Sequence, residues 1–194
     1  MNELTNIIFV RHAQSVYGND DRIRDLSTEG KKDRDIVLHT LKDRKIDAFL
    51  SSPYTRSIET IRPAAEYFDL SIHTDERLRE RKVGSHLPEL LKKRWADLSF
   101  AEEGGESLLS VKERNIEALA QILKDYKNRT VVIGTHGTAL SMMIKRYRND
   151  FGLDDFLRIV NFMAKEYYIS KEIIVLFMKE ILIMIKWMEK VNYI

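Results

Sequence analysis

Short apolar runs bounded by polar residues recur along the chain and predict the strands of a sheet. Asn6–Val10, Asp47–Ser51 and Val131–Gly134 are each too short for a core helix and are uninterrupted enough for a buried strand. Ser71–Asp75 is a weaker strand candidate. Because parallel strands are covered on both faces, their sequences are nearly continuous apolar runs, so this pattern favours a mostly parallel sheet.

Segments with apolar residues at helical spacing separate these runs. Ser27 lies where a hydroxyl would cap the first helix. The other helices are predicted over Tyr54–Phe68, Glu106–Tyr126 and Thr138–Tyr147, and Pro63 should kink or break the first of these three. The alternation predicts an α/β fold, a three-layer α/β/α sandwich with a mostly parallel central sheet. We expect one domain over 1–194, with residues 83–105 as an irregular insertion.

The C-terminal segment, residues 162–194, departs from this alternation. Lys171–Lys190 has a nearly continuous apolar pattern that predicts a helix with a wide apolar face. Such a face must cover the core, a second protomer or a membrane surface, and core packing or a homodimer is the first expectation. Lys179 and Glu180 interrupt Ile173–Ile185, which leaves no transmembrane segment of roughly 20 apolar residues.

Composition excludes several classes of function. A formal net charge of +2 is too small to suggest a protein that binds nucleic acid, which would usually carry a concentrated basic face. The absence of cysteine excludes disulfides, thiolate metal sites and a cysteine nucleophile, and it suits a cytoplasmic location. The N-terminus reaches Arg11 too early for the apolar core of a signal peptide. The histidines have no close pair at metal-ligand spacing, so we expect neither a metal nor a cofactor.

Chemically capable side chains follow three of the predicted strands. Arg11 and His12 end the first, Ser51–Arg56 follows the second, and Thr135–Gly137 follows the last. The carboxyl ends of strands in an open parallel sheet converge on the ligand crevice, where helix N-termini also favour anions. Two histidines and two arginines at one rim would make a cationic pocket for phosphate.

Each residue type has a function in such a pocket. Arginine stays charged and matches phosphate oxygens with a fork of donors, which suits Arg11 and Arg56. A neutral imidazole at His12 can attack phosphorus, and His136 can stabilise the charge on the oxygens. The leaving alkoxide needs a proton, for which a nearby carboxylic acid is the obvious source. A single histidine beside a strand is more often structural, so this interpretation depends on the whole set.

Six segments in order resemble the histidine phosphatase superfamily, also called phosphoglycerate-mutase-like, and in particular its small phosphatase branch. The segments are Phe9–Ser15, Leu26–Gly30, Ser51–Thr60, Leu78–Glu80, Gly104–Ser107 and Ile133–Gly137. The resemblance covers about residues 6 to 145. Ala13 stands where the family usually has glycine, and Ser85–Pro88 replaces an aromatic-containing stretch, which affects the side of the site that would hold the leaving group.

The resemblance implies a role for each residue. His12 would be the phosphorylated nucleophile, with Arg11, Arg56 and His136 around the phosphate and Glu80 as proton donor. Gln14, Ser15, Asn19 and Arg24 would be neighbours of the substrate. The function implied is hydrolysis of a small phosphorylated metabolite through a phosphohistidine. The alternatives are phosphoglycerate-mutase-type phosphoryl transfer and a non-catalytic phospholigand-binding protein.

Overall fold

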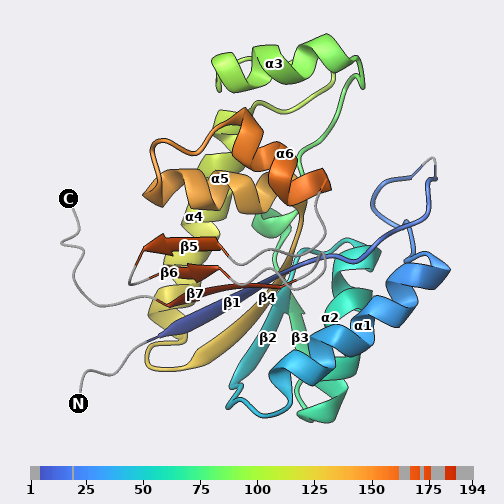
Figure 1. Cartoon of the computed structure of the whole chain (residues 1–194), viewed down its shortest axis with the longest axis vertical. Helices are drawn as coiled ribbons and strands as arrows, with labels where there is room; N and C mark the ends of the chain where they lie inside the picture. Colours follow the sequence, from blue (N-terminus) through green and yellow to red (C-terminus); the bar gives the residue numbers. More distant parts are fainter. Residues whose placement is uncertain (1–4, 19, 162–166, 171–172, 176–181, 187–194) are drawn as a thin grey trace.

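The computed structural model describes residues 5–18, 20–161, 167–170, 173–175 and 182–186. Its main sheet has the strand order β3-β2-β4-β1-β7 (Figure 1). The four strands β1 (Asn6–Arg11), β2 (Ala48–Ser51), β3 (Ile72–Thr74) and β4 (Thr130–Thr135) pair in parallel, as the apolar runs predicted. The predicted α/β fold is therefore confirmed.

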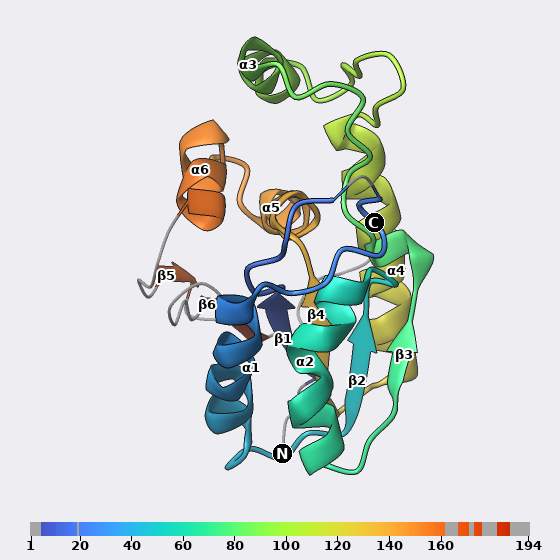
Figure 2. The ribbon, with the colours of Figure 1, turned by 90° about the vertical axis from the view of Figure 1, so that its right-hand side faces the viewer.

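Helices cover both faces of this sheet. Successive residues of a strand point to opposite sides, so an uninterrupted apolar run places apolar side chains on both faces, and both must be buried. Ile8 and Val10 of β1 pack in one cluster with α1 (Thr28–Leu41) and α2 (Thr55–Tyr67). Ile7 and Phe9 pack in the other with α4 (Leu108–Asp125), α5 (Gly137–Tyr147) and α6 (Leu153–Asn161). Figure 2 shows α1 and α2 together on one side of the strands. Each apolar run is thus buried on both faces.

Two local predictions about the helices have different outcomes. The Ser27 hydroxyl accepts a hydrogen bond from the Gly30 backbone N–H at 3.1 Å, so Ser27 caps α1 as expected. Pro63 was expected to kink or break its helix, but α2 continues without a break from Thr55 to Tyr67. The prediction of a break was wrong, because the ordered turns on both sides of Pro63 bury Ile61, Ala64 and Ala65 in the core.

The segment 83–105 is more regular than expected, because it contains helix α3 (Pro88–Ala96). A short 3-10 helix, η1 (Glu76–Leu78), precedes this segment in the chain. Figure 1 shows α3 beyond α5 and α6, well away from the sheet. Pro88 begins α3, at a position where its missing N–H leaves no helical hydrogen bond unmade.

The C-terminal prediction was wrong where the structure describes that part of the chain. A helix was expected, but the described residues form the strands β5 (Tyr167–Ser170), β6 (Ile173–Val175) and β7 (Leu182–Lys186). β7 pairs antiparallel with β1, whose other edge is taken by β4, and β5 pairs with β6. Short apolar segments suit either structure, and the open edge of β1 favours a strand.

Two further expectations, a homodimer and the absence of a transmembrane segment, concern the C-terminal segment. The homodimer through this C-terminal segment stays a prediction. Within the described residues, no helix combines the length and apolar character needed to cross a membrane.

Candidate active site

The register of the central strands brings the two predicted histidines together. Arg11 pairs with Thr135 at the ends of β1 and β4, and the His12 backbone N–H donates to the Thr135 carbonyl at 2.9 Å. The rings of His12 and His136 therefore lie side by side, with centroids 5.1 Å apart and planes inclined by 60°. Residues separated by more than a hundred positions thus share one rim of the sheet.

The backbone determines which nitrogen of His12 carries the lone pair. Nδ1 lies 2.7 Å from the Ala13 carbonyl oxygen, and because a carbonyl can only accept, Nδ1 must carry a proton. In the neutral ring the lone pair is then on Nε2, which accepts from the Arg56 Nε–H at 3.2 Å. Burial lowers the pKa of His12 well below 6.5, and the charges of Arg56 and Arg11 lower it further. His12 is therefore neutral near pH 7.

His136 is fully buried beside His12. Its Nε2 lies 2.7 Å from the Ser52 hydroxyl, and the edge of Tyr54 packs against its ring with a centroid distance of 5.1 Å. Its Nδ1 is buried without a hydrogen-bond partner in the described part of the chain. Burial is the main cause that lowers the pKa of His136 well below 6.5; the electrostatic interaction with the His12 ring, in its protonated form, and with Arg56 lowers it further. A polar atom left in this state is available to an incoming ligand.

The two arginines of the predicted site come from different elements, Arg11 from the end of β1 and Arg56 from α2. Arg56, in the first turn of α2, is buried and donates to the Asp21 carbonyl at 2.5 Å and to its carboxylate at 3.3 Å. Arg11 donates to the carbonyl oxygens of Ile159 at 2.5 Å and Val160 at 3.3 Å, in the last turn of α6. Both guanidinium groups thus have acceptors from the protein that phosphate oxygens could replace.

Glu80 lies against the N-terminus of α5, the helix that follows His136. Its carboxylate accepts from the backbone N–H groups of Thr138 at 3.0 Å, Ala139 at 3.2 Å and Arg81 at 2.7 Å. The charge of Glu80 acts on Arg56 and on Tyr54, so it belongs to the same electrostatic environment. The N-terminus of α5, which begins directly after His136, thus orients this carboxyl group.

The expected substrate neighbours have different positions. The Gln14 side chain is directed to α1, where it accepts from the Ser27 hydroxyl at 2.7 Å, and Ser15 forms a single β-bridge with Leu26. Arg24 is closer to the site, as its effect on His12 indicates: the charge of Arg24 contributes to lowering the pKa of His12. Asn19 lies outside the described residues.

Two polar residues of the site were missed by the sequence analysis. Ser52 holds His136, and it follows strand β2 within a segment already singled out for Arg56, so its place at the strand end was a usable signal. Asp21 forms ion pairs with both Arg56 at 3.3 Å and Arg24 at 2.9 Å. No pattern in the sequence marks Asp21, because a loop brings it to the arginines. In the described residues no three histidine or acidic side chains are grouped so that they could hold a metal ion.

The chain is similar to known proteins over most of its length. The sequence profile of the histidine phosphatase superfamily (branch 1) matches residues 7–165. Phosphoserine phosphatase 1 of Hydrogenobacter thermophilus is 30% identical over 157 residues, which are 72% of this chain and 74% of that protein. The metal-independent phosphoserine phosphatase of Arabidopsis thaliana is 30% identical over 165 residues, 74% of this chain and 69% of that protein.

A solved structure shows the same fold. It is a mutant phosphoserine phosphatase from Entamoeba histolytica in complex with phosphoserine, with a TM-score of 0.68 and 19% identity. The match covers 91% of this chain and 96% of the other.

Proposed function

Because the chain belongs to branch 1 of the histidine phosphatase superfamily, we propose that it is a phosphatase that hydrolyses monoesters of small metabolites through a phosphohistidine on His12. The observation that carries this proposal is the hydrogen bond from Nδ1 of His12 to the Ala13 carbonyl at 2.7 Å. It leaves the Nε2 lone pair beside Arg56 and opposite His136, where a phosphate would be held.

In the first step Nε2 of His12 attacks phosphorus, so that the N–P bond forms while the bond to the ester oxygen breaks. The ester oxygen takes the bonding electron pair and a proton from the carboxyl group of Glu80, and the alcohol leaves. The phosphorylated ring keeps the Nδ1 proton and becomes positively charged. The Ala13 carbonyl stabilises that charge through the same hydrogen bond.

In the second step Glu80, now ionised, takes a proton from a water molecule that attacks phosphorus. The N–P bond breaks, its electron pair returns to Nε2, inorganic phosphate leaves and neutral His12 is restored. Arg11, Arg56 and His136 stabilise the charge on the equatorial oxygens in both steps. The three backbone N–H donors around Glu80 hold its carboxyl group in place through both steps.

Phosphate release from p-nitrophenyl phosphate tests the nucleophile. We expect His12→Ala to lower kcat by about a thousandfold or more. His73→Ala is a matched control, because His73 lies exposed on β3, the strand at the far side of the sheet from β1, and its activity should stay near that of the unmodified protein. Equal rates for the protein and His12→Ala would reject the mechanism.

The nature of the leaving group tests Glu80. Glu80→Gln should lower kcat for an alkyl phosphate by about 10² to 10³, because an alkoxide needs a proton to leave. The loss should be much smaller for p-nitrophenyl phosphate, whose nitrophenolate leaves without one. Equal losses on both esters would show that Glu80 does not donate the proton.

Net release of phosphate also separates hydrolysis from the two alternatives. A mutase would isomerise a phosphoglycerate and depend on a bisphosphoglycerate while releasing little phosphate. A non-catalytic phospholigand-binding protein would bind the ester without turnover. Phosphate release that needs no bisphosphoglycerate supports the phosphatase.

A further inference from the structure

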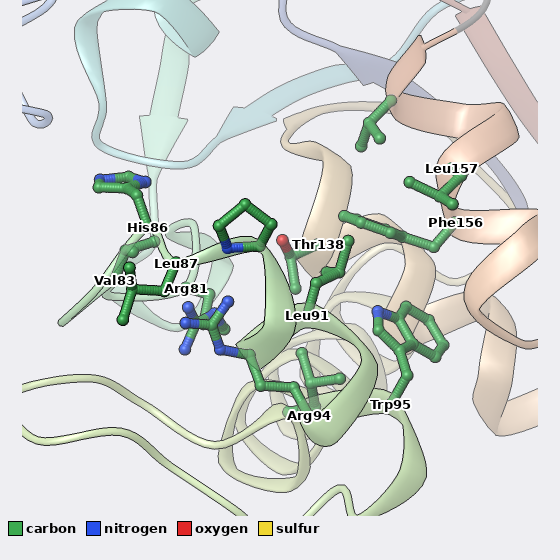
Figure 3. A pocket seen from close by; sticks show the side chains of 13 residues that line it. Arg81, Val83, His86, Leu87, Leu91, Arg94, Trp95, Thr138, Phe156 and Leu157 are labelled. Carbon is green, nitrogen blue, oxygen red and sulfur yellow. The ribbon is translucent and has the colours of Figure 1, made fainter.

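A pocket of about 350 Å³ lies between α3 and α6. Apolar side chains form most of its wall, among them Leu91 and Trp95 of α3 and Phe156 and Leu157 of α6. Figure 3 shows Trp95, Phe156 and Leu157 along one side, with Arg81 and Arg94 together on the other and Thr138 between them. The pocket is therefore an apolar site with polar groups at one side.

This pocket adjoins the proposed catalytic groups. The backbone N–H of Thr138, which lines the pocket, donates to the Glu80 carboxylate at 3.0 Å. Val160 lines it too, and its carbonyl accepts from Arg11 at 3.3 Å. A group that extends into the pocket from an ester oxygen beside Glu80 would lie on the leaving-group side of the phosphate.

The two arginines of the pocket already have acceptors from the protein. Arg81 donates to the Glu102 carboxylate at 2.9 Å and to the Glu106 carbonyl at 2.7 Å. Arg94 donates to the same carboxylate at 2.9 Å and to the Ser85 carbonyl at 2.7 Å. Because their strong donors point to Glu102 and to carbonyl groups, these arginines hold the segment around α3 in place.

We infer that this pocket is the subsite for the leaving group and that it accepts an uncharged, apolar alcohol, an alkyl or aryl group, in preference to one that carries a carboxylate. The inference rests on the proposed function and specifies its substrate class. Burial of apolar surface gives the selectivity, since each buried methylene contributes a favourable increment. A carboxylate in the same place would lose its water, and the two buried arginines of the pocket already donate to the Glu102 carboxylate.

Three primary alkyl phosphates test the inference, because their leaving oxygens are chemically alike. They are ethyl phosphate, hexyl phosphate and the hexyl ester with a carboxylate at its far end. We expect kcat/KM to rise about tenfold or more from ethyl to hexyl, and to fall about tenfold when the terminal carboxylate is added. Equal values for ethyl and hexyl, or a gain from the carboxylate, would overturn the inference.

Leu87→Asp locates the selectivity in this pocket. Leu87 lines the pocket, is 55% exposed and is the N-cap of α3, a position where aspartate is a favoured residue, so the variant should fold. The ratio of hexyl to ethyl kcat/KM should fall about fivefold. Leu109→Asp is the matched control, because Leu109 is 37% exposed on α4 and outside the pocket lining, and its ratio should not change. An unchanged ratio in Leu87→Asp would refute the assignment.

The two levels of the proposal fail in different ways. Turnover of ethyl phosphate that is lost in His12→Ala, but without a preference for hexyl, would leave the phosphatase standing and remove the apolar subsite. Turnover that is the same in His12→Ala would reject the proposed function itself, and the subsite with it.

Discussion

Replacing Glu102 by glutamine should destabilise the segment that carries α3. The Glu102 side chain is 6% exposed and forms ion pairs with Arg81 and Arg94, which are 4% and 8% exposed. Its carboxylate also accepts from the Gly84 backbone N–H at 3.0 Å. Glutamine keeps the shape of the side chain but removes the charge between two buried guanidinium groups, and it directs N–H donors toward other donors.

The expected loss follows from this burial. Removing one partner of a buried ion pair costs about 3–5 kcal/mol, because the remaining charge is buried without compensation. At roughly 2–4 °C for each kcal/mol in a chain of this size, the melting temperature should fall by on the order of 10 °C. Glu117→Gln is the matched control, since Glu117 is 70% exposed and its pair with Arg77 should contribute about 1 kcal/mol or less.

Thermal unfolding followed by circular dichroism measures the global effect, and limited digestion with trypsin measures local opening. Lys92, Lys93 and Arg94 lie within α3, so release of this segment exposes trypsin sites. We expect Glu102→Gln to melt earlier, to be cut faster in α3, or both. Melting temperatures and cleavage rates equal to those of Glu117→Gln would refute the argument from burial.

The pH dependence gives an independent check of sign. Burial alone would raise the pKa of Glu102, but hydrogen bonds from Arg81 and Arg94 outweigh it and hold the pKa far below its usual value. A depressed carboxylate pKa adds stability above the unfolded value of about 4.3, and this contribution is lost as the pH falls toward the folded value. The difference in stability between the protein and Glu102→Gln should therefore shrink as the pH falls below about 4.

Three further predictions concern the catalytic site. When kcat/KM is plotted against pH and corrected for ionisation of the substrate, its acidic limb should lie below pH 6.5, because the lowered pKa of His12 keeps the ring neutral in mild acid. A limb above pH 6.5 would contradict this. Ser52→Ala should lower kcat about tenfold with little change in KM, because the Ser52 hydroxyl, 2.7 Å from Nε2 of His136, orients that ring. An unchanged kcat in steady-state kinetics would exclude that role. Asp21→Asn should lower KM several-fold, since its carboxylate competes with the substrate for Arg56; an unchanged or higher KM would show that it does not compete.

Local patterns were enough to predict most of the elements that position the site. The apolar runs before His12 and His136 became β1 and β4, because a continuous apolar run is stable only where both faces are covered. The general geometry of parallel sheets then predicted that both histidines would lie at one rim, and their rings are 5.1 Å apart.

Contacts between distant segments were beyond the reach of these patterns. Asp21 reaches Arg56 through a loop, and Glu80 meets the N-terminus of α5 across 58 positions. Only the resemblance of the segment Leu78–Glu80 to the family singled out Glu80, and nothing in the local sequence distinguishes Asp21 from the solvated acidic residues around it. Their partners became known only once the chain was folded.

Local sequence was sufficient for the α/β alternation, the cap at Ser27 and the polar residues at the strand ends, because periodicity and hydrogen-bonding side chains act over a few residues. Long-range contacts were needed to make residues 182–186 a strand and to direct a lone pair of His12 at Arg56. Both depend on backbone groups supplied by other parts of the chain: the open edge of β1 for the strand, and the Ala13 carbonyl, as oriented by the fold, for the tautomer of His12.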